Sequence, residues 1–274
     1  MQTVVTPEAM TAAAIGWRGL TIGLVPTMGF LHDGHVSLIH ALRPRVDRLV
    51  VSIYVNPLQF GPTEDLSRYP RDPAGDAAKC AAAGTDVLFS PERFYPDGFR
   101  TEVSVHGLTD RLCGASRPGH FEGVATVVTR LFGVTRCDVA IFGEKDFQQL
   151  QVIRRFTGDL ALPVEIVPGP LVRDVDGVAL SSRNVYLSPE ERGRARSIPR
   201  ATAAVKRAFE DGEREVATLE AIGVAALDVD RVDYLEVLPE DTLSRDEGSG
   251  PWRVFVAAFV GRTRLIDNLA LGAP

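Results

Sequence analysis

The stretch that decides the fold runs from Leu24 to Leu38 and reads LVPTMGFLHDGHVSL. Residues 20–25 have strand-type composition, Pro26 ends this strand, and apolar residues between 36 and 42 recur with the spacing of one helical face. Free backbone N–H groups at a helix start attract phosphate. A strand, a tight turn and a helix in direct succession therefore predict an ATP site in an α/β protein.

Two histidines, His32 and His35, stand at the start of this helix, and Gly34 between them leaves room for a nucleotide against the backbone. Imidazoles placed there are suited to the charge that develops when an α-phosphate is attacked. The alternative is that both rings only cap or satisfy the turn. A P-loop is set aside because His35 stands where that motif needs lysine. A zinc site is disfavoured because no third ligand follows at a recognisable spacing.

Composition narrows the class of protein. The chain has 274 residues, 45% of them hydrophobic, with a formal charge of -6, which argues against a nucleic-acid partner. Three scattered cysteines, Cys80, Cys113 and Cys137, form no framework, so a reducing, cytoplasmic compartment is expected. The first ten residues lack a leader pattern, and no apolar run is long enough for a membrane span.

Strand and helix patterns alternate through the first two thirds of the chain. Strands are expected at residues 48–55, 87–89, 138–142 and 164–167, and helices at 72–83, 124–132 and 146–160. This alternation predicts an α/β fold with a Rossmann-like, doubly wound parallel sheet. Ligands lie outside the carboxyl ends of such strands, where residues 26–35, 56–62 and 143–149 are expected to converge.

The pattern changes near residue 187. Two helices are expected at about 191–210 and 216–226, followed by strands at 232–238, 253–260 and 263–269, the last two joined by a Gly261-Arg262 hairpin. The expected domains are therefore residues 1–186, which bind ATP and substrate, and residues 187–274, a smaller C-terminal α+β domain closing over the site.

Three further polar clusters follow strands or link the domains. Asn56 and Gln59 offer carboxamide donors and acceptors for a small hydroxy acid, or else satisfy the loop backbone, and residues 61–72 after them fit a mobile loop. In the stretch from Phe142 to Gln149, Lys145 suits ATP phosphates and Gln149 faces substrate, while Asp146 holds a ribose hydroxyl or caps the helix. Ser181, Ser182 and Arg183 suit a phosphate clamp.

Together these segments resemble the pantothenate synthetase family. The shared patterns lie at residues 26–35, 55–60, 117–121, 142–149 and 176–184, with Arg-Leu-Ile-Asp-Asn at 264–268. The resemblance implies a nucleotidylyltransferase fold related to class I aminoacyl-tRNA synthetases, a homodimer, Mg²⁺, and condensation of D-pantoate with β-alanine driven by cleavage of ATP to AMP and pyrophosphate. It assigns no metal ligand.

The resemblance also implies roles for matching residues. The ATP-binding set is Met28, His32, Gly34, His35, Gly143, Lys145, Asp146, Val172, Ser181, Ser182 and Arg183. Of these, His32, His35, Lys145 and Arg183 are expected to be catalytic through the phosphates. Asn56, Gln59 and Gln149 are expected to hold pantoate, with His120 near the same pocket. His40 and His106 match nothing and are expected to be structural or exposed.

Two positions depart from the family pattern. Leu180 stands where methionine usually precedes Ser-Ser-Arg, which conserves volume and is expected to be tolerated. Cys113 stands in Leu-Cys-Gly where relatives have Leu-Glu-Gly, so this chain lacks that charge.

The expected reaction has two steps. The pantoate carboxylate attacks the α-phosphate to give pantoyl adenylate, and the β-alanine amine then displaces AMP. One rival is a nucleotidyltransferase that keeps AMP on its product, although Asn56 and Gln59 favour a small hydroxy acid. The other is a non-catalytic nucleotide-binding regulator, against which the intact polar clusters argue.

Overall fold

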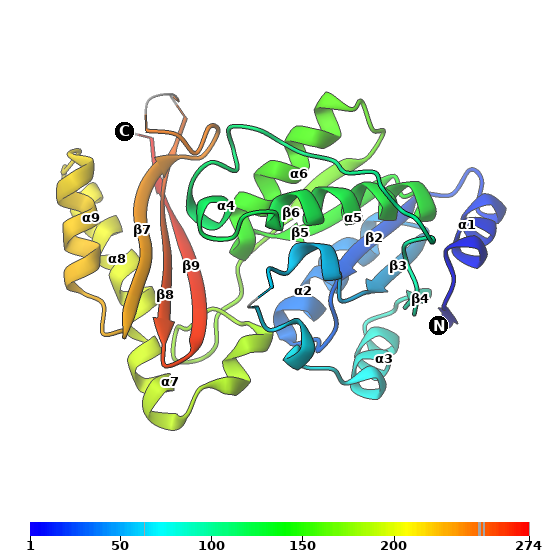
Figure 1. The fold of residues 1–274 in the computed structure, drawn as a ribbon, viewed down its shortest axis with the longest axis horizontal. Helices are drawn as coiled ribbons and strands as arrows, with labels where there is room; N and C mark the ends of the chain where they lie inside the picture. Colours follow the sequence, from blue (N-terminus) through cyan, green and yellow to red (C-terminus); the bar gives the residue numbers. More distant parts are fainter. Residues whose placement is uncertain (63, 246–247, 249, 274) are drawn as a thin grey trace. The chain divides into compact units, whose positions relative to one another are not determined.

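The computed structural model describes all residues except 63, 246–247, 249 and 274. The chain forms two compact units, drawn together in Figure 1. The first comprises Met1–Val105, Arg117–Glu144 and Gln149–Pro170, and the second comprises His106–Ser116, Lys145–Gln148 and Leu171–Pro274. The loop expected at 61–72 includes residue 63, which lies outside the described residues.

The first unit is built on a six-stranded sheet whose paired strands all run parallel. The strand order is β1-β4-β3-β2-β5-β6. The strands are β1 (Gln2–Val4), β2 (Ile22–Thr27), β3 (Arg48–Ile53), β4 (Val87–Phe89), β5 (Val139–Gly143) and β6 (Glu165–Gly169). The predicted α/β class with a parallel sheet is confirmed.

Helices lie on both faces of this sheet, as Figure 1 shows. They are α1 (Pro7–Gly16), α2 (Asp33–Leu42), α3 (Pro73–Ala82), α5 (His120–Thr135) and α6 (Phe147–Asp159). Apolar residues of α2 and α3 form one core cluster with β2, β3 and β5. Phe132 of α5 and Phe156 of α6 are in ring contact at 6.3 Å on the other face.

The order of the strands fixes where a ligand can bind. After β2 the chain moves outward to β3 and β4, and it then returns to place β5 on the other side of β2. The point between β2 and β5 is therefore a topological switch point, where the loops at the strands' carboxyl ends diverge and leave room for a ligand. The turn after β2 and the residues after β5 both start there.

The second unit contains an antiparallel sheet of β7 (Arg231–Pro239), β8 (Trp252–Val260) and β9 (Thr263–Gly272), in that order. Its helices are α4 (Leu112–Ser116), α7 (Pro189–Ala195), α8 (Ser197–Glu210) and α9 (Val216–Ala225). One face of α8 buries Ile198, Ala201, Val205 and Phe209 in a core with the sheet. The predicted hairpin between the last two strands is confirmed, with Gly261 at φ 57°.

Some local expectations were wrong. Pro26 lies inside β2 rather than ending it, and this is tolerated because β5 pairs with β2 only at Gly23 and Leu24. The helix expected at 124–132 begins earlier, at His120, directly after Gly119 in the left-handed conformation. The helix expected at 191–210 is divided into α7 and α8.

The strand β1 and the helices α1 and α4 were not predicted. β1 and α4 have three and five residues, too few to show a period. For α1 a start signal exists, since the side chain of Thr6 accepts a hydrogen bond from Ala9 N–H and Pro7 follows it.

Candidate active site

The turn after β2 has a backbone conformation at Gly29 that favours glycine. Gly29 has φ +85°, and a Cβ there would lie 3.0 Å from Ile53 Cγ2 and 3.1 Å from Asp76 Oδ2. The hydroxyl of Thr27 donates to Ser52 O at 2.8 Å and accepts from Gly29 N–H at 3.2 Å. These contacts tie the turn to β3, so the residues leading to His32 are held in one conformation.

Asp76 supplies the main support of this turn, and sequence reasoning missed it. Its carboxylate on α3 is 2% exposed and accepts hydrogen bonds from Phe30 N–H at 2.8 Å and Leu31 N–H at 2.7 Å. The ammonium of Lys79, one turn later, donates to Leu31 O at 2.7 Å. An acidic residue in a first helical turn looks like an ordinary helix-dipole partner, so no local signal could have revealed its contact with the turn.

His32 and His35 lie together at the start of α2. Their ring centroids are 4.0 Å apart, and His35 Nδ1 accepts a hydrogen bond from His32 N–H at 3.3 Å. The His35 ring therefore does accept a hydrogen bond from the backbone of the turn, which was one of the two alternatives for this residue. In a neutral ring whose Nδ1 accepts, the proton lies on Nε2, so His35 has an N–H of the kind that suits a phosphate oxygen. Gly34 lies between them on the first turn of α2.

Asn56 and Gln59 lie beyond the carboxyl end of β3. The Asn56 amide donates to Gln59 Oε1 at 3.1 Å and to Gly123 O at 3.0 Å, while its oxygen accepts from Leu58 N–H at 3.3 Å and from the Tyr95 hydroxyl at 2.9 Å. These four bonds, two donated and two accepted, use the full hydrogen-bonding capacity of the Asn56 carboxamide. The alternative that Asn56 satisfies the loop is thus what the structure shows for this side chain, and its contact with pantoate stays a prediction.

The amide of Gln59 contacts Met28, a residue of the first cluster. Gln59 Nε2 lies 3.2 Å from Met28 Sδ, and its oxygen accepts from Asn56. Asn56 therefore orients Gln59, and Gln59 joins the turn after β2 to the loop after β3. Close approach of α5 helps to fix this loop, because a Cβ on Gly123 would lie 2.4 Å from Leu58 O.

His120 also contacts this loop. Its Nδ1 lies 2.9 Å from Gln59 O, which can only accept, so Nδ1 donates and Nε2 accepts from Arg117 Nη1 at 3.0 Å. Arg117 in turn forms a bidentate pair with Glu64 at 2.7 and 2.6 Å. Burial alone would raise the pKa of Glu64, but Arg117, together with His120 and the backbone of Gly61, holds that pKa below its ordinary value. This chain of contacts places His120 against Gln59, and its nearness to bound pantoate stays a prediction.

Lys145 and Asp146 lie in a short 3-10 turn, Glu144–Asp146, between β5 and α6. The Lys145 ammonium is 3.8 Å from the exposed carboxylate of Asp146. Lys145 and Ser181 line one small pocket of the second unit, together with Ala179 and Asp267. Gly143 ends β5 and Gln149 follows in α6, both in the first unit.

The segment from Val172 to Arg183 forms a hairpin-like turn in the second unit. Leu180 N–H donates to Val172 O at 3.0 Å, and Gly177 at φ +88° closes the turn. The Ser181 hydroxyl accepts from Arg183 N–H at 3.3 Å and so begins the 3-10 turn Ser182–Tyr186. Ser181 and Arg183 are partly exposed and Ser182 is buried.

Cys113 lies in a polar cluster of the second unit. Its Sγ is 3.3 Å from the Tyr234 hydroxyl and 3.6 Å from both terminal nitrogens of Arg264. Arg264 has a carboxylate partner in Asp233, at 2.7 and 2.9 Å. The guanidinium thus remains paired although Cys113 carries no carboxylate. All three cysteines are free thiols, and His40 and His106 are exposed, as expected.

The described residues contain no group of three or more His, Cys, Asp or Glu side chains placed to hold a metal ion. Among the helices they form, none has the length and apolar character needed to cross a membrane.

The parallel sheet, with its histidine-bearing turn at the switch point, is the architecture of an α/β nucleotide-binding protein. Comparison with known proteins identifies the family. The family described as Pantoate-beta-alanine ligase matches residues 2–270. The chain belongs to this family, and it is an enzyme of the pantoate-β-alanine ligase class.

Individual relatives agree with this assignment. Pantothenate synthetase 1 of Bradyrhizobium diazoefficiens is 55% identical over 91% of this chain and 90% of its own length. Pantothenate synthetase of Myxococcus xanthus is 50% identical over 99% and 96% of the two chains.

Solved structures show the same fold. Pantothenate synthetase of Thermus thermophilus aligns with a TM-score of 0.94 at 46% identity, covering 99% of this chain and 100% of its own. Pantoate-beta-alanine ligase of Francisella tularensis, solved in complex with beta-gamma ATP and β-alanine, aligns with a TM-score of 0.82 at 30% identity, covering 99% and 98%.

Proposed function

We propose that this enzyme condenses D-pantoate with β-alanine through a pantoyl adenylate, releasing AMP and pyrophosphate. The observation that carries this proposal is the pair His32 and His35 at the start of α2, beside the switch point of the parallel sheet. The helix start and an imidazole donor are both suited to phosphate oxygens. ATP and β-alanine bound to the Francisella relative support the choice of substrates.

The first step is attack of a pantoate carboxylate oxygen on the α-phosphorus of ATP. A new phosphorus–oxygen bond forms and the bond to pyrophosphate breaks. Negative charge is redistributed over the phosphate oxygens in the transition state, so donors fixed in advance lower its energy. We assign this role to His32, His35, Lys145 and Arg183, with Ser181 and Ser182 as further phosphate contacts and with Met28, Gly34, Gly143, Asp146 and Val172 around the rest of ATP.

The second step is attack of the β-alanine amine on the acyl carbon, which releases AMP and a proton. No covalent bond to the enzyme is needed, so holding pantoate in place supplies much of the rate. We assign this to Gln59, which Asn56 orients, and to Gln149, with His120 fixing the backbone of Gln59.

Mg²⁺, which the family resemblance implies, enters as part of the Mg·ATP substrate. The homodimer implied by the family resemblance and the cytoplasmic location expected from the scattered cysteines stay predictions.

The fate of oxygen tests the proposed chemistry. With both carboxylate oxygens of pantoate labelled with ¹⁸O, turnover should give AMP that carries one ¹⁸O, because the attacking oxygen stays on phosphorus when the amine displaces AMP. Mass spectrometry of the nucleotide and phosphate products measures this. Label in inorganic phosphate, with ADP as the nucleotide, would indicate an acyl phosphate and contradict the adenylate.

A further inference from the structure

The stretch Arg-Leu-Ile-Asp-Asn at 264–268 lies on β9, and its last residue is Asn268. Asn268 is 4% exposed. Its side-chain amide donates to the main-chain oxygen of Lys145 at 2.9 Å, across 123 positions of sequence. Its side-chain oxygen accepts from Arg253 Nη1 at 2.5 Å, and its main-chain N–H donates to Asp267 Oδ1 at 2.8 Å. Asn268 is thus held by residues of its own sheet, Arg253 on β8 and Asp267 on β9, and in turn holds the main chain of Lys145.

Residues of the neighbouring strand β8 contact Phe147, which follows the turn Glu144–Asp146 and begins α6. The Arg253 guanidinium lies 3.9 Å above the ring of Phe147, and its Nε donates to Glu240 at 2.9 Å. Phe255, which pairs with Asn268 in the sheet register, has its ring 5.9 Å from the ring of Phe147. The turn carrying Lys145 and the first residue of α6 are therefore held by adjacent positions of one sheet.

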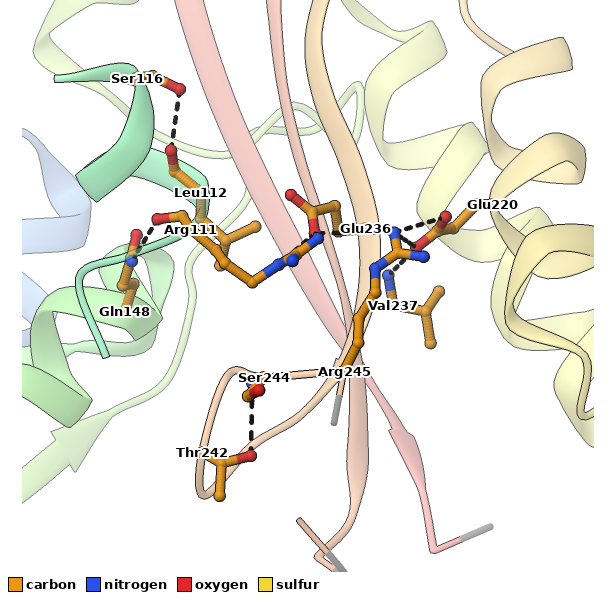
Figure 2. A network of polar contacts seen from close by, with 10 residues as sticks. All are labelled: Arg111, Leu112, Ser116, Gln148, Glu220, Glu236, Val237, Thr242, Ser244 and Arg245. Atoms are coloured by element: carbon orange, nitrogen blue, oxygen red, sulfur yellow. Dashed lines mark hydrogen bonds and ion pairs between the residues drawn. The ribbon is translucent and has the colours of Figure 1, made fainter. Parts of the chain in front are cut away.

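Gln148, the next residue of α6, is bound to the segment His106–Ser116 of the second unit. Its amide donates to Leu108 O and Arg111 O at 2.9 and 2.8 Å, and its oxygen accepts from Cys113 N–H at 2.9 Å. Figure 2 shows the contact with Arg111, whose guanidinium pairs with Glu236 of β7. Residues Lys145–Gln148 consequently belong to the second unit, whereas Glu144 before them and Gln149 after them belong to the first.

We propose that Asn268 is a positioning residue for the reaction and that it acts by fixing the main chain of Lys145. This inference rests on the proposed function, because it takes the Lys145 ammonium to contact ATP phosphate. A 3-10 turn of three residues has poor hydrogen-bond geometry of its own, so an outside donor is needed to hold its carbonyl. A shift of about 1 Å at a reacting group costs up to roughly 100-fold in rate.

Two variants isolate the contact. Asn268→Asp keeps the oxygen that accepts from Arg253 and loses the donor to Lys145 O, whereas Asn268→Ala loses both without adding charge. Each should slow single-turnover adenylate formation by about tenfold. The KM for pantoate should stay unchanged. Glu220→Gln is the matched control, because it weakens the contacts of Glu220 with Arg245 and Val237 N–H in the same unit (Figure 2). It should change the rate by less than about twofold.

A double-mutant cycle with Lys145→Ala separates positioning from general support of the fold. If Asn268 acts through Lys145, Asn268→Asp should cause no further loss of adenylation rate in the Lys145→Ala background, because the group it positions is gone. Its effect on the urea midpoint should be the same in both backgrounds, since the carbonyl of residue 145 remains. Rate loss that depends on Lys145, with stability loss that does not, is the expected signature.

Each other result overturns the proposal in an identifiable way. Equal rate loss in both backgrounds means that Asn268 acts elsewhere. Slowing by Asn268→Ala alone assigns the effect to the Arg253 contact, and slowing by Asn268→Asp alone assigns it to charge. Normal rates in both variants, while Lys145→Ala is slow, refute the positioning role and leave the proposed function intact. A normal rate in Lys145→Ala removes Lys145 from the proposed function, and the role of Asn268 falls with it.

Discussion

Replacing Lys145 or His35 by alanine is expected to slow adenylate formation by roughly 100- to 1,000-fold, equivalent to about 3–4 kcal/mol. Both side chains are assigned to phosphate charge in the transition state, so the loss should appear in the chemical step. Neither is fully buried, and each replacement should change the free energy of unfolding by about 1 kcal/mol or less. Single-turnover formation of pantoyl adenylate with saturating Mg·ATP measures the effect.

Gln59→Ala is the control for this experiment. Gln59 is assigned to pantoate, so this variant should mainly weaken pantoate binding, measured by calorimetry. Lys145→Ala and His35→Ala should bind pantoate normally, because Gln59 and Gln149 remain. Near-normal adenylation by either of these two variants, or their unfolding at ambient temperature, would show that scaffold residues have been taken for the active site.

Replacing Asp76 by alanine is expected to destabilise the protein by about 3 kcal/mol. The variant leaves the N–H groups of Phe30 and Leu31 without their charged acceptor in a buried turn. Because this turn leads directly to His32, adenylation should also slow even where the protein is fully folded. Urea unfolding gives the stability change, and single-turnover kinetics give the rate.

Asp72→Ala distinguishes support of the turn from support of helix α3. Asp72 caps the same helix by accepting from Gly75 N–H at 3.0 Å, so its loss should cost about 1 kcal/mol and leave adenylation unchanged. Asp76→Asn keeps one acceptor oxygen, so its free energy of unfolding should lie between those of Asp76→Ala and Asp72→Ala. If Asp76→Ala were no more destabilising than Asp72→Ala, the carboxylate would not be the support of the turn that its contacts indicate.

The sheet could be predicted because its strands have a strong local signal. Mostly apolar runs such as residues 49–53 of β3 are typical of parallel strands buried on both faces. The turn at Gly29 and the helix α2 follow another such strand, β2. The site residues in these turns could be found because a strand's carboxyl end is where a parallel sheet binds ligands.

What the sequence could not predict depends on contacts between distant positions. Asp76 accepts a hydrogen bond from Phe30 N–H, 46 positions away in the sequence, and Asn268 donates one to Lys145 O, 123 positions away. Asn56 shows a second limit, because its residue type suits substrate or loop equally, and only the structure shows four bonds within the protein. Side-chain pairing across the fold is determined by packing, and no spacing pattern encodes it.

The measurement that tests the central claim most directly is isotope exchange between labelled pyrophosphate and ATP. The claim is that pantoyl adenylate forms before β-alanine reacts. Enzyme, Mg·ATP and pantoate without β-alanine should therefore move label from pyrophosphate into ATP, and Lys145→Ala should reduce this exchange in proportion to its loss of adenylation. Exchange that appears only when β-alanine is added would contradict the claim, because it would mean that no adenylate forms before the amine binds.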